Sequence, residues 1–266
     1  MNFYKYCPLA VIVFIAFNLP GVHGQGIAPH DSVSRFERII KSGVLRLGVP
    51  GDYAPFAMAK GDSLYGADIT LGRSLASALG VRPVFIKTSW PTLMSDMRNN
   101  VFDIALGGIS ITPERQALAS FSVSYHTGGK TFLCRREDSA RFSTVEAVDK
   151  SGVRIIVNHG GTNETTARSL FHTASIQVYP DNIGIFNEII AGRADVMVTD
   201  DTEADLKAKQ YPQLCRSYPG IIGKSYKALW IQKDPALVAF VNNWLQKEIA
   251  LGMPQKWLNE AMAAGK

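Results

Sequence analysis

The residues best suited to chemistry gather in a few glycine-rich or polar segments, and the first of these spans residues 107–115. Gly107 and Gly108 leave backbone N–H groups open to a ligand, and Ser110 adds a hydroxyl. The planar guanidinium of Arg115 can hold a carboxylate through two parallel hydrogen bonds, although it could instead form a solvated surface pair with Glu114. This combination of groups predicts a binding site for a carboxylate.

A second segment, residues 159–164, reads His-Gly-Gly-Thr-Asn-Glu and opens a predicted helix. The free N–H groups and the dipole at a helix start favour an anion, which places Thr162 and Asn163 among the expected ligand contacts. The Lys-Ser/Thr ending of a phosphate-binding P-loop is missing. Glu164, in the first turn, would normally stay ionised and stabilise the helix. To donate a proton near neutral pH it would need its pKa raised by burial in a closed cleft.

Aromatic and acidic residues near the same strand ends complete the candidate site. Tyr53, in a turn that contains proline, and Trp90, at a predicted helix start, could form walls for a flat ligand, or they could simply cover the core. Asp200 follows a buried strand, where it could accept a ligand ammonium or cap the next helix. The histidines show no metal-ligand spacing and no serine-nucleophile motif is present, so we predict neither a metal nor an organic cofactor.

These segments must be positioned by strands and helices that alternate along the chain, which is the pattern of an α/β fold. Apolar runs predict strands at residues 44–49, 84–86, 103–106, 154–157, 176–179, 196–199 and 228–231. The four-residue spacing of Leu71, Leu75 and Leu79 predicts a helix that Asp68 can cap and Gly80 ends. Further helices are predicted at 162–171, 183–191 and 235–251, with a short one near position 257.

The order of these elements predicts two lobes. The pattern restarts near Arg136 and returns at the end of the chain, so the chain is expected to cross between lobes twice, and two crossings make a hinge. We predict two α/β lobes joined by a two-strand hinge, with residues 25–135 and 222–266 in the first lobe and 136–221 in the second. In open α/β sheets a ligand lies beyond the carboxyl ends of the strands, here the loops after positions 49, 106, 157 and 199.

Residues 1–24 have the features of a signal peptide, with a positive start at Lys5, an apolar run at 9–17 and a small-residue exit before Gly24. The apolar run is about half of the roughly 20 residues that span a bilayer, so a membrane anchor is the weaker interpretation. We predict cleavage near Gly24 and a periplasmic protein without stable membrane anchoring.

Cleavage would leave two cysteines, Cys134 and Cys215, in an oxidising compartment. We predict a disulfide between them, with two buried free thiols as the alternative. The formal charge of +5 over 266 residues falls to +4 when Lys5 is lost, a surplus that suits solubility and anionic ligands. Lysines and arginines are scattered and no nucleic-acid motif is present, so no nucleic-acid partner is expected.

Several of these segments together resemble the polar amino-acid (family 3) solute-binding proteins of ABC importers. The resemblance rests on residues 53–56 (Tyr-Ala-Pro-Phe), 102–105, 110–115 and Asp200, and it covers nearly all of the mature chain. It implies a type II periplasmic-binding fold with Arg115 and Ser110 on the ligand carboxylate and Thr162 as a further contact. Asp200 would hold an α-amine, and the two aromatic residues would enclose the ligand side chain.

A closer resemblance is to the exported cyclohexadienyl dehydratases, which are enzymes on a binding-protein scaffold. It rests on residues 51–53, 88–94 (Thr-Ser-Trp-Pro-Thr-Leu-Met), 128–131 (Gly-Gly-Lys-Thr), 158–164 and 179–182 (Tyr-Pro-Asp-Asn). This family removes water and carbon dioxide from prephenate or arogenate, giving phenylpyruvate or phenylalanine, without a cofactor. The resemblance implies that Glu164 is the general acid, while Lys130 binds the second carboxylate or organises the acid.

Three positions depart from the dehydratase pattern. His159 stands where proline is expected, Gly107 where serine is expected and Tyr226 where glutamate is expected. We interpret the chain as a cyclohexadienyl dehydratase that acts on a small dicarboxylate. The alternative is an amino-acid-binding protein of an ABC transporter, and only that alternative implies a permease partner. Catalyst and receptor share this fold, so the site must decide between them.

Overall fold

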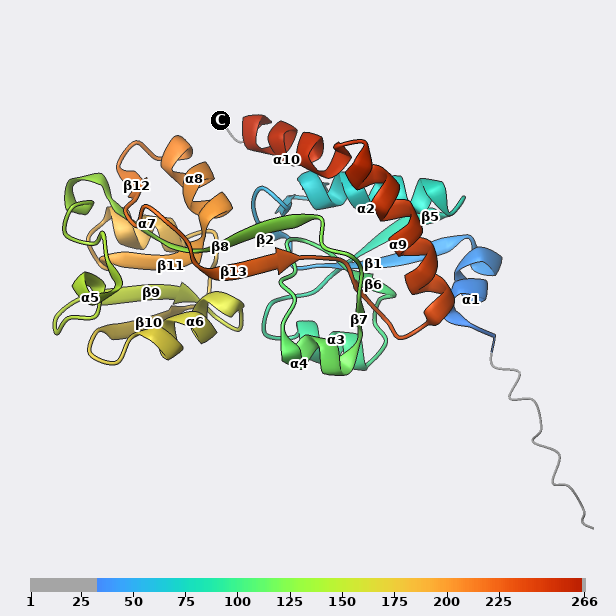
Figure 1. The fold of residues 1–266 in the computed structure, drawn as a ribbon, viewed down its shortest axis with the longest axis horizontal. Helices are drawn as coiled ribbons and strands as arrows, with labels where there is room; N and C mark the ends of the chain where they lie inside the picture. The colour runs from blue at the N-terminus through green and yellow to red at the C-terminus, as the bar shows by residue number, and fades with distance from the viewer. Residues whose placement is uncertain (1–32, 265–266) are drawn as a thin grey trace, which may run out of the picture. The chain divides into compact units, whose positions relative to one another are not determined.

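A computed structural model describes residues 33–264, so the predicted signal peptide at 1–24 lies outside the described residues. Within the described part, helices and strands build two α/β lobes, each with its own sheet (Figure 1). The predicted fold class is therefore confirmed. None of the helices between residues 33 and 264 is both long enough and apolar enough to cross a membrane.

The sheet of the first lobe has five strands in the spatial order β5-β1-β6-β14-β7. β1 pairs in parallel with β5 and β6, whereas β14 pairs antiparallel with β6 and β7. The strands are β1 (Val44–Val49), β5 (Arg82–Lys87), β6 (Ile104–Ala105), β7 (Ser120–Phe121) and β14 (Trp230–Ile231). A small antiparallel sheet follows β1 and contains β2 (Asp52–Tyr53), β3 (Ala57–Lys60) and β4 (Ser63–Tyr65).

Helices cover both faces of this first sheet. Successive side chains of a strand point to opposite faces. Accordingly, Ile104 lies in the core with α2 and α9, whereas its neighbour Ala105 lies in the core with α3. The helices of the first lobe are α1 (Arg35–Ser42), α2 (Ala67–Ala78), α3 (Leu93–Arg98), α4 (Pro113–Leu118), α9 (Pro235–Ala250) and α10 (Met253–Ala264). The short helix predicted near Trp257 is thus the longer α10.

The sheet of the second lobe runs in the order β10-β9-β11-β8-β12, and β13 pairs with β8. Its strands are β8 (His126–Arg135), β9 (Arg154–Asn158), β10 (Ser175–Tyr179), β11 (Val196–Asp200), β12 (Leu214–Arg216) and β13 (Ile222–Lys227). Its helices are the 3₁₀ turn η1 (Arg136–Asp138), α5 (Val145–Val148), α6 (Thr162–Leu170), α7 (Ile185–Ile190) and α8 (Asp201–Gln210). Separate apolar cores on the two faces of this sheet explain why β9 and β11 are almost wholly buried.

Two antiparallel strands, β8 and β13, run side by side between the two lobes (Figure 1). They form the predicted two-strand hinge, although neither strand was predicted from the sequence. β8 also pairs with β11 and β12 of the second sheet, over Lys130 to Arg135. The lobe boundaries proposed at 135/136 and 221/222 stay a prediction.

Asp68 has a different role from the predicted helix cap. The N-cap of α2 is Gly66, and Asp68 is fully buried in the first turn. Its Oδ2 accepts hydrogen bonds from the N–H groups of Gly107 and Gly108, both at 2.7 Å. Gly108 has φ +71°, and a Cβ there would come within 2.5 Å of the Tyr53 ring, so the turn requires glycine. Asp68 thereby fixes the turn that precedes Ser110.

The two cysteines lie directly opposite each other on adjacent strands. Cys134 of β8 and Cys215 of β12 are partners in the antiparallel register, and both are buried. The structure contains them as free thiols, so the predicted disulfide is not formed in it. Burial raises the pKa of the Cys134 thiol to about 12.

Candidate functional site

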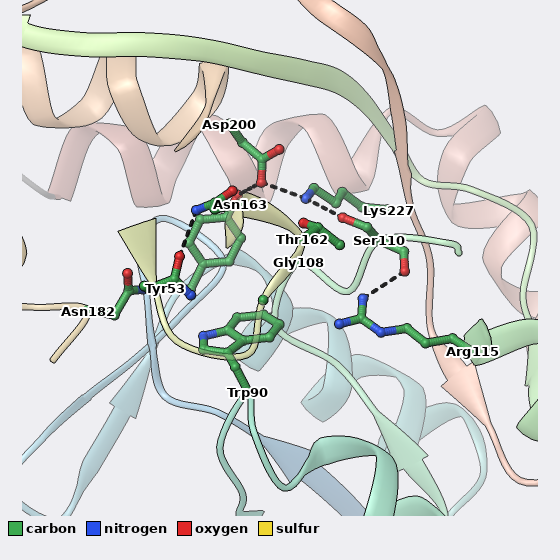
Figure 2. Close-up of a pocket in the computed structure, with 12 residues that line it drawn as sticks. Tyr53, Trp90, Gly108, Ser110, Arg115, Thr162, Asn163, Asn182, Asp200 and Lys227 are labelled. Atoms are coloured by element: carbon green, nitrogen blue, oxygen red, sulfur yellow. Dashed lines mark hydrogen bonds and ion pairs between the residues drawn. The ribbon is translucent and has the colours of Figure 1, made fainter. Parts of the chain in front are cut away.

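A pocket lies at the carboxyl ends of strands from both lobes (Figure 2). Tyr53 follows β1 and Gly108 follows β6 in the first lobe, whereas Asp200 ends β11 in the second. The pocket is lined by Tyr53, Trp90, Gly108, Ser110, Arg115, Asn158, Gly161, Thr162, Asn163, Asn182, Asp200 and Lys227. All eight residues that were predicted to bind the substrate are among them.

Arg115 reaches the pocket from the first turn of α4. Thr112 caps this helix, and its hydroxyl accepts a hydrogen bond from the Arg115 N–H at 3.3 Å. The guanidinium is buried and donates to the Ser110 carbonyl at 2.9 Å, while no carboxylate of residues 33–264 lies within ion-pair distance of it. Burial lowers the pKa of Arg115 to about 10, so it remains a cation at neutral pH. The alternative surface pair with Glu114 is not formed.

Asp200 is held by two lysines and a tyrosine. Lys227 Nζ lies 2.8 Å from its Oδ2, Lys130 Nζ lies 2.9 Å from its Oδ1, and the Tyr53 hydroxyl donates to Oδ2. Burial alone would raise the pKa of Asp200, but the two lysine charges hold it well below its usual range. Its side chain makes no cap hydrogen bond with α8. Asp200 is therefore an ionised carboxylate whose partners belong to the protein itself.

Lys130 connects Asp200 to the start of α6. Its Nζ donates to Thr162 Oγ1 at 2.9 Å and to Asn163 Oδ1 at 2.5 Å. Burial lowers the pKa of Lys130, although the charge of Asp200 opposes the shift. Gly161 is the N-cap of α6 and provides no side-chain cap, so the first N–H groups of this helix are available to an anion. Thr162 is the first helical residue of α6.

Lys227 is a pocket residue that the sequence analysis missed. It ends the hinge strand β13, its side chain is almost fully buried, and its Nζ donates to Ser110 Oγ at 2.9 Å. It thus contacts a first-lobe hydroxyl and a second-lobe carboxylate together. The sequence around Lys227 did not indicate that this lysine is buried. Its burial follows from the pairing of β13 with β8, which places Lys227 in the pocket.

The charges around the pocket do not cancel. Arg115, Lys130 and Lys227 are three buried cations, and Asp200 is the ionised carboxylate beside them. This leaves a surplus of two positive charges among these four residues. Such a site attracts a ligand with two negative charges.

Glu164 does not meet the requirement for a proton donor in this structure. Its side chain accepts hydrogen bonds from the Gly160 N–H at 3.1 Å and from Arg168 at 2.9 Å, and it is not among the residues that line the pocket. The Gly160 N–H and the charges of Arg168 and His159 lower the pKa of Glu164. The helix start and an i,i+4 ion pair keep this carboxyl ionised here, and the role of Glu164 as the general acid stays a prediction.

Glu203 has the burial and the raised pKa that were expected of Glu164, although it too is not among the residues that line the pocket. It lies in the first turn of α8 with 1% of its surface exposed, and burial raises its pKa to about 7, with Asp200 and Asp52 adding to the shift. Its Oε2 accepts a hydrogen bond from the Thr199 hydroxyl, which in turn lies 3.5 Å from the Nδ2 of Asn163 in the pocket. A glutamate near the start of an otherwise polar helix gave no sequence signal of burial.

Aromatic rings form a wall of the pocket. The rings of Tyr53 and Trp90 meet edge to face with centroids 5.9 Å apart, and both residues also pack against the first-lobe core. The Trp90 indole N–H donates to Asp52 Oδ1 at 2.8 Å. Both interpretations of Tyr53 and Trp90 therefore hold, because each residue packs against the core and also lines the pocket. Among the described side chains, no group of three or more His, Cys, Asp or Glu could hold a metal ion.

Comparison with known proteins decides the family. Residues 45–260 match the bacterial extracellular solute-binding proteins, family 3. The chain belongs to this family. Family 3 membership agrees with the type II periplasmic-binding fold that was expected, with its two lobes and its hinge.

Relatives within family 3 include both an enzyme and a binding protein. The chain is 44% identical over 214 residues to the cyclohexadienyl dehydratase of Pseudomonas aeruginosa, a match that covers 80% of each chain. The structure of an ancestral amino acid-binding protein, a precursor of cyclohexadienyl dehydratase, superposes with a TM-score of 0.80 at 32% identity, covering 86% of this chain and 100% of that one. An ancestral cyclohexadienyl dehydratase is 43% identical with a TM-score of 0.51, covering 86% and 98%.

Proposed function

We propose that this protein is a cyclohexadienyl dehydratase that converts prephenate to phenylpyruvate and arogenate to phenylalanine. The similarity to the Pseudomonas aeruginosa enzyme along 80% of both chains supports this activity. The reaction needs a site that binds carboxylates, excludes water and delivers one proton. It requires no metal or organic cofactor.

The observation that carries the proposal is the surplus of two positive charges among Arg115, Lys130, Lys227 and Asp200, at and beside the pocket. Prephenate brings two carboxylates, which match that surplus. A simple amino acid and arogenate both bring an ammonium, which needs a free carboxylate, whereas Asp200 is already engaged by Lys130, Lys227 and Tyr53. Breaking these contacts would leave two buried lysines without a partner, which is costly. The charge pattern therefore favours prephenate over arogenate as the better substrate.

Two groups of donors suit the two carboxylates. Arg115 and Ser110 would hold one carboxylate on the first lobe, since the Gly108 N–H is already donated to Asp68. The N–H groups at the start of α6, with Thr162 and Asn163, would hold the other on the second lobe. Lys130 would organise this second group, since it already bonds both side chains. A substrate held from both lobes also stabilises their closure.

We assign the proton donor to Glu203 rather than to Glu164. A general acid works best when its pKa lies near the working pH, and the pKa of Glu203 is raised to about 7. Glu164 has a lowered pKa and an ion pair with Arg168. Glu203 does not line the pocket, and its connection to the pocket runs through the Thr199 hydroxyl, which contacts Asn163.

The conversion of prephenate to phenylpyruvate then needs one proton from the protein. The acid gives its proton to the ring hydroxyl, and the carbon–oxygen bond breaks to release water. The bond between the ring and its carboxylate also breaks, carbon dioxide leaves, and the electron pair of that bond enters the ring. The ring becomes aromatic, which provides the driving force. The cations beside Asp200 would stabilise the charge that moves during this step.

The alternative function is amino-acid binding for an ABC transporter. The similarity to an ancestral amino acid-binding protein favours it, and the fold serves both functions. Under this alternative Asp200 would exchange a lysine for the ligand ammonium when the lobes close. Only this alternative implies a permease partner.

We also propose that the protein works in the periplasm after export through the signal peptide at residues 1–24. Membership of a family of extracellular proteins supports this location. Amino-terminal sequencing of the exported protein should then begin near residue 25.

A direct assay tests the proposed activity. The purified mature protein should convert prephenate to phenylpyruvate, which is followed by its absorbance. Arg115→Met is the matched inactive control, because it removes the cation without adding bulk. If neither prephenate nor arogenate is consumed and one amino acid instead raises the unfolding temperature, the transporter alternative is correct.

A further inference from the structure

Asn182 presents a buried acceptor to the pocket. It lies between β10 and α7, with 6% of its surface exposed, and it lines the pocket. Its Nδ2 donates to the Asp52 carbonyl of the first lobe at 3.0 Å. Its Oδ1 is one of three buried side-chain oxygens within residues 33–264 that have no hydrogen-bond partner. A buried acceptor without a donor costs free energy, so a site that keeps one is built for a ligand.

The orientation of this amide is determined by its partner. A carbonyl oxygen accepts hydrogen bonds and cannot donate them, so only the NH₂ group of Asn182 can face Asp52. The amide oxygen must therefore be the atom without a partner. The ligand atom that meets it must be a donor, and a carboxylate cannot satisfy it.

We propose that Asn182 Oδ1 accepts the hydrogen of the substrate's ring hydroxyl, and that this contact selects ligands that carry the hydroxyl. The inference rests on the proposed function and names a residue that touches the leaving group. In the prephenate dianion the ring hydroxyl is the hydrogen-bond donor. Asn182 is thus matched to the group that the reaction must remove.

The layout of the pocket supports this assignment. Figure 2 shows Arg115 and Asn182 on opposite sides of the pocket, with Tyr53 and Trp90 between them. In prephenate the hydroxyl lies across the ring from the carbon that carries the two acidic groups. A substrate whose carboxylate is held by Arg115 therefore directs its hydroxyl toward Asn182.

The same contact prepares the proton transfer. When the hydroxyl donates its own hydrogen to Asn182, its lone pairs are free to accept the proton of Glu203. Asn182 would thus orient the leaving oxygen, while Glu203 protonates it and the carbon–oxygen bond breaks.

The test compares prephenate with 4-deoxyprephenate, which has the same ring and the same two carboxylates but no hydroxyl. Asn182→Leu keeps the size of the side chain and removes both polar groups. We expect it to lower kcat/KM for prephenate roughly 10- to 100-fold, while the inhibition constant of 4-deoxyprephenate changes less than about threefold. Asn182→Asp is the matched control, since it loses the Asp52 contact but keeps an acceptor. Asn182→Asp should weaken the binding of prephenate and of 4-deoxyprephenate by a similar factor.

The outcomes separate this inference from the proposed function. If Asn182→Leu weakens both ligands equally, or neither, Asn182 does not recognise the hydroxyl and the inference is overturned. Asn182→Ala repeats the comparison if the leucine variant does not fold. If the wild type has no turnover, the proposed function fails. Calorimetric dissociation constants for the same two ligands then still decide the role of Asn182.

Discussion

Lys227 Nζ lies 2.8 Å from Asp200 Oδ2 and 2.9 Å from Ser110 Oγ, so one lysine of the hinge contacts both lobes inside the pocket. The side chains of Lys227 and Asp200 are 2% and 7% exposed. Ion pairs with so little solvent access are strongly destabilised when one partner is removed, because the remaining charge has no water to replace it. Substitutions in the Lys227–Asp200 pair should therefore affect both the stability of the protein and the ligands that it binds.

Asp200→Asn should destabilise the protein by about 3 kcal/mol, because Lys130 and Lys227 lose their shared counter-charge. Urea unfolding of the two proteins measures the difference. The double variant with Lys227→Met should recover part of the loss. Asp205→Asn is the control, since its pair with Arg216 is half exposed and should contribute less than about 1 kcal/mol. Equal effects of the two aspartate variants would contradict the burial argument.

Glu203→Gln should lower kcat for prephenate by roughly 10²- to 10⁴-fold, because the isosteric amide cannot donate the proton. Substrate affinity should change less than about tenfold, since the two side chains have the same shape. Glu164→Gln should cost less than about tenfold in kcat, because that carboxylate is ionised and paired with Arg168. Steady-state kinetics of both variants decide between the two glutamates, and the reverse ranking would restore Glu164 as the acid.

The pH dependence of kcat should report Glu203. The donor must be protonated, and its pKa is raised to about 7, so kcat should fall as the pH rises through about 7. A descending limb near pH 4.5 would indicate an ordinary, water-exposed carboxyl instead.

The raised pKa of Glu203 should also make the free energy of unfolding depend on pH. The folded protein binds the Glu203 proton more tightly than the unfolded chain does, because the pKa moves from 4.5 to about 7. This contribution stabilises the folded state below about pH 4.5 and is lost as the pH rises through about 7. The stability of the wild type relative to Glu203→Gln should therefore fall by about 3 kcal/mol between acidic and alkaline pH. Urea unfolding of both proteins across that range measures the change, and a constant difference would refute the raised pKa.

Cys134 and Cys215 should form a disulfide in the exported protein. Residues directly opposite in an antiparallel pair have Cα atoms about 4.5–5.5 Å apart, which is within the range of a disulfide. Thiol titration of the denatured, unreduced mature protein should find no free cysteine. Reduction should then lower the free energy of unfolding by up to about 4 kcal/mol, because the bridge closes a long loop. Two free thiols would rule out the bridge.

Several features of the site follow from the sequence alone. Strand and helix periodicity predicts β1 at its observed bounds, and the rule that ligands lie at the carboxyl ends of strands identifies seven of the lining residues. These predictions succeed because they depend on local patterns, namely apolar runs, glycine turns and helix starts. Arg115 illustrates this, since its place after Gly108 and Ser110 already indicates a carboxylate site.

Only the tertiary structure decides which charges are buried and paired. Glu164 and Glu203 both lie in the first turn of a helix, yet Glu164 pairs with the exposed Arg168, whereas Glu203 is fully buried and bonded to Thr199. Lys227 enters the pocket because β13 pairs with β8, which starts about a hundred residues earlier in the chain. A pKa depends on desolvation and on charges brought from distant parts of the chain, and neither quantity is written in local sequence.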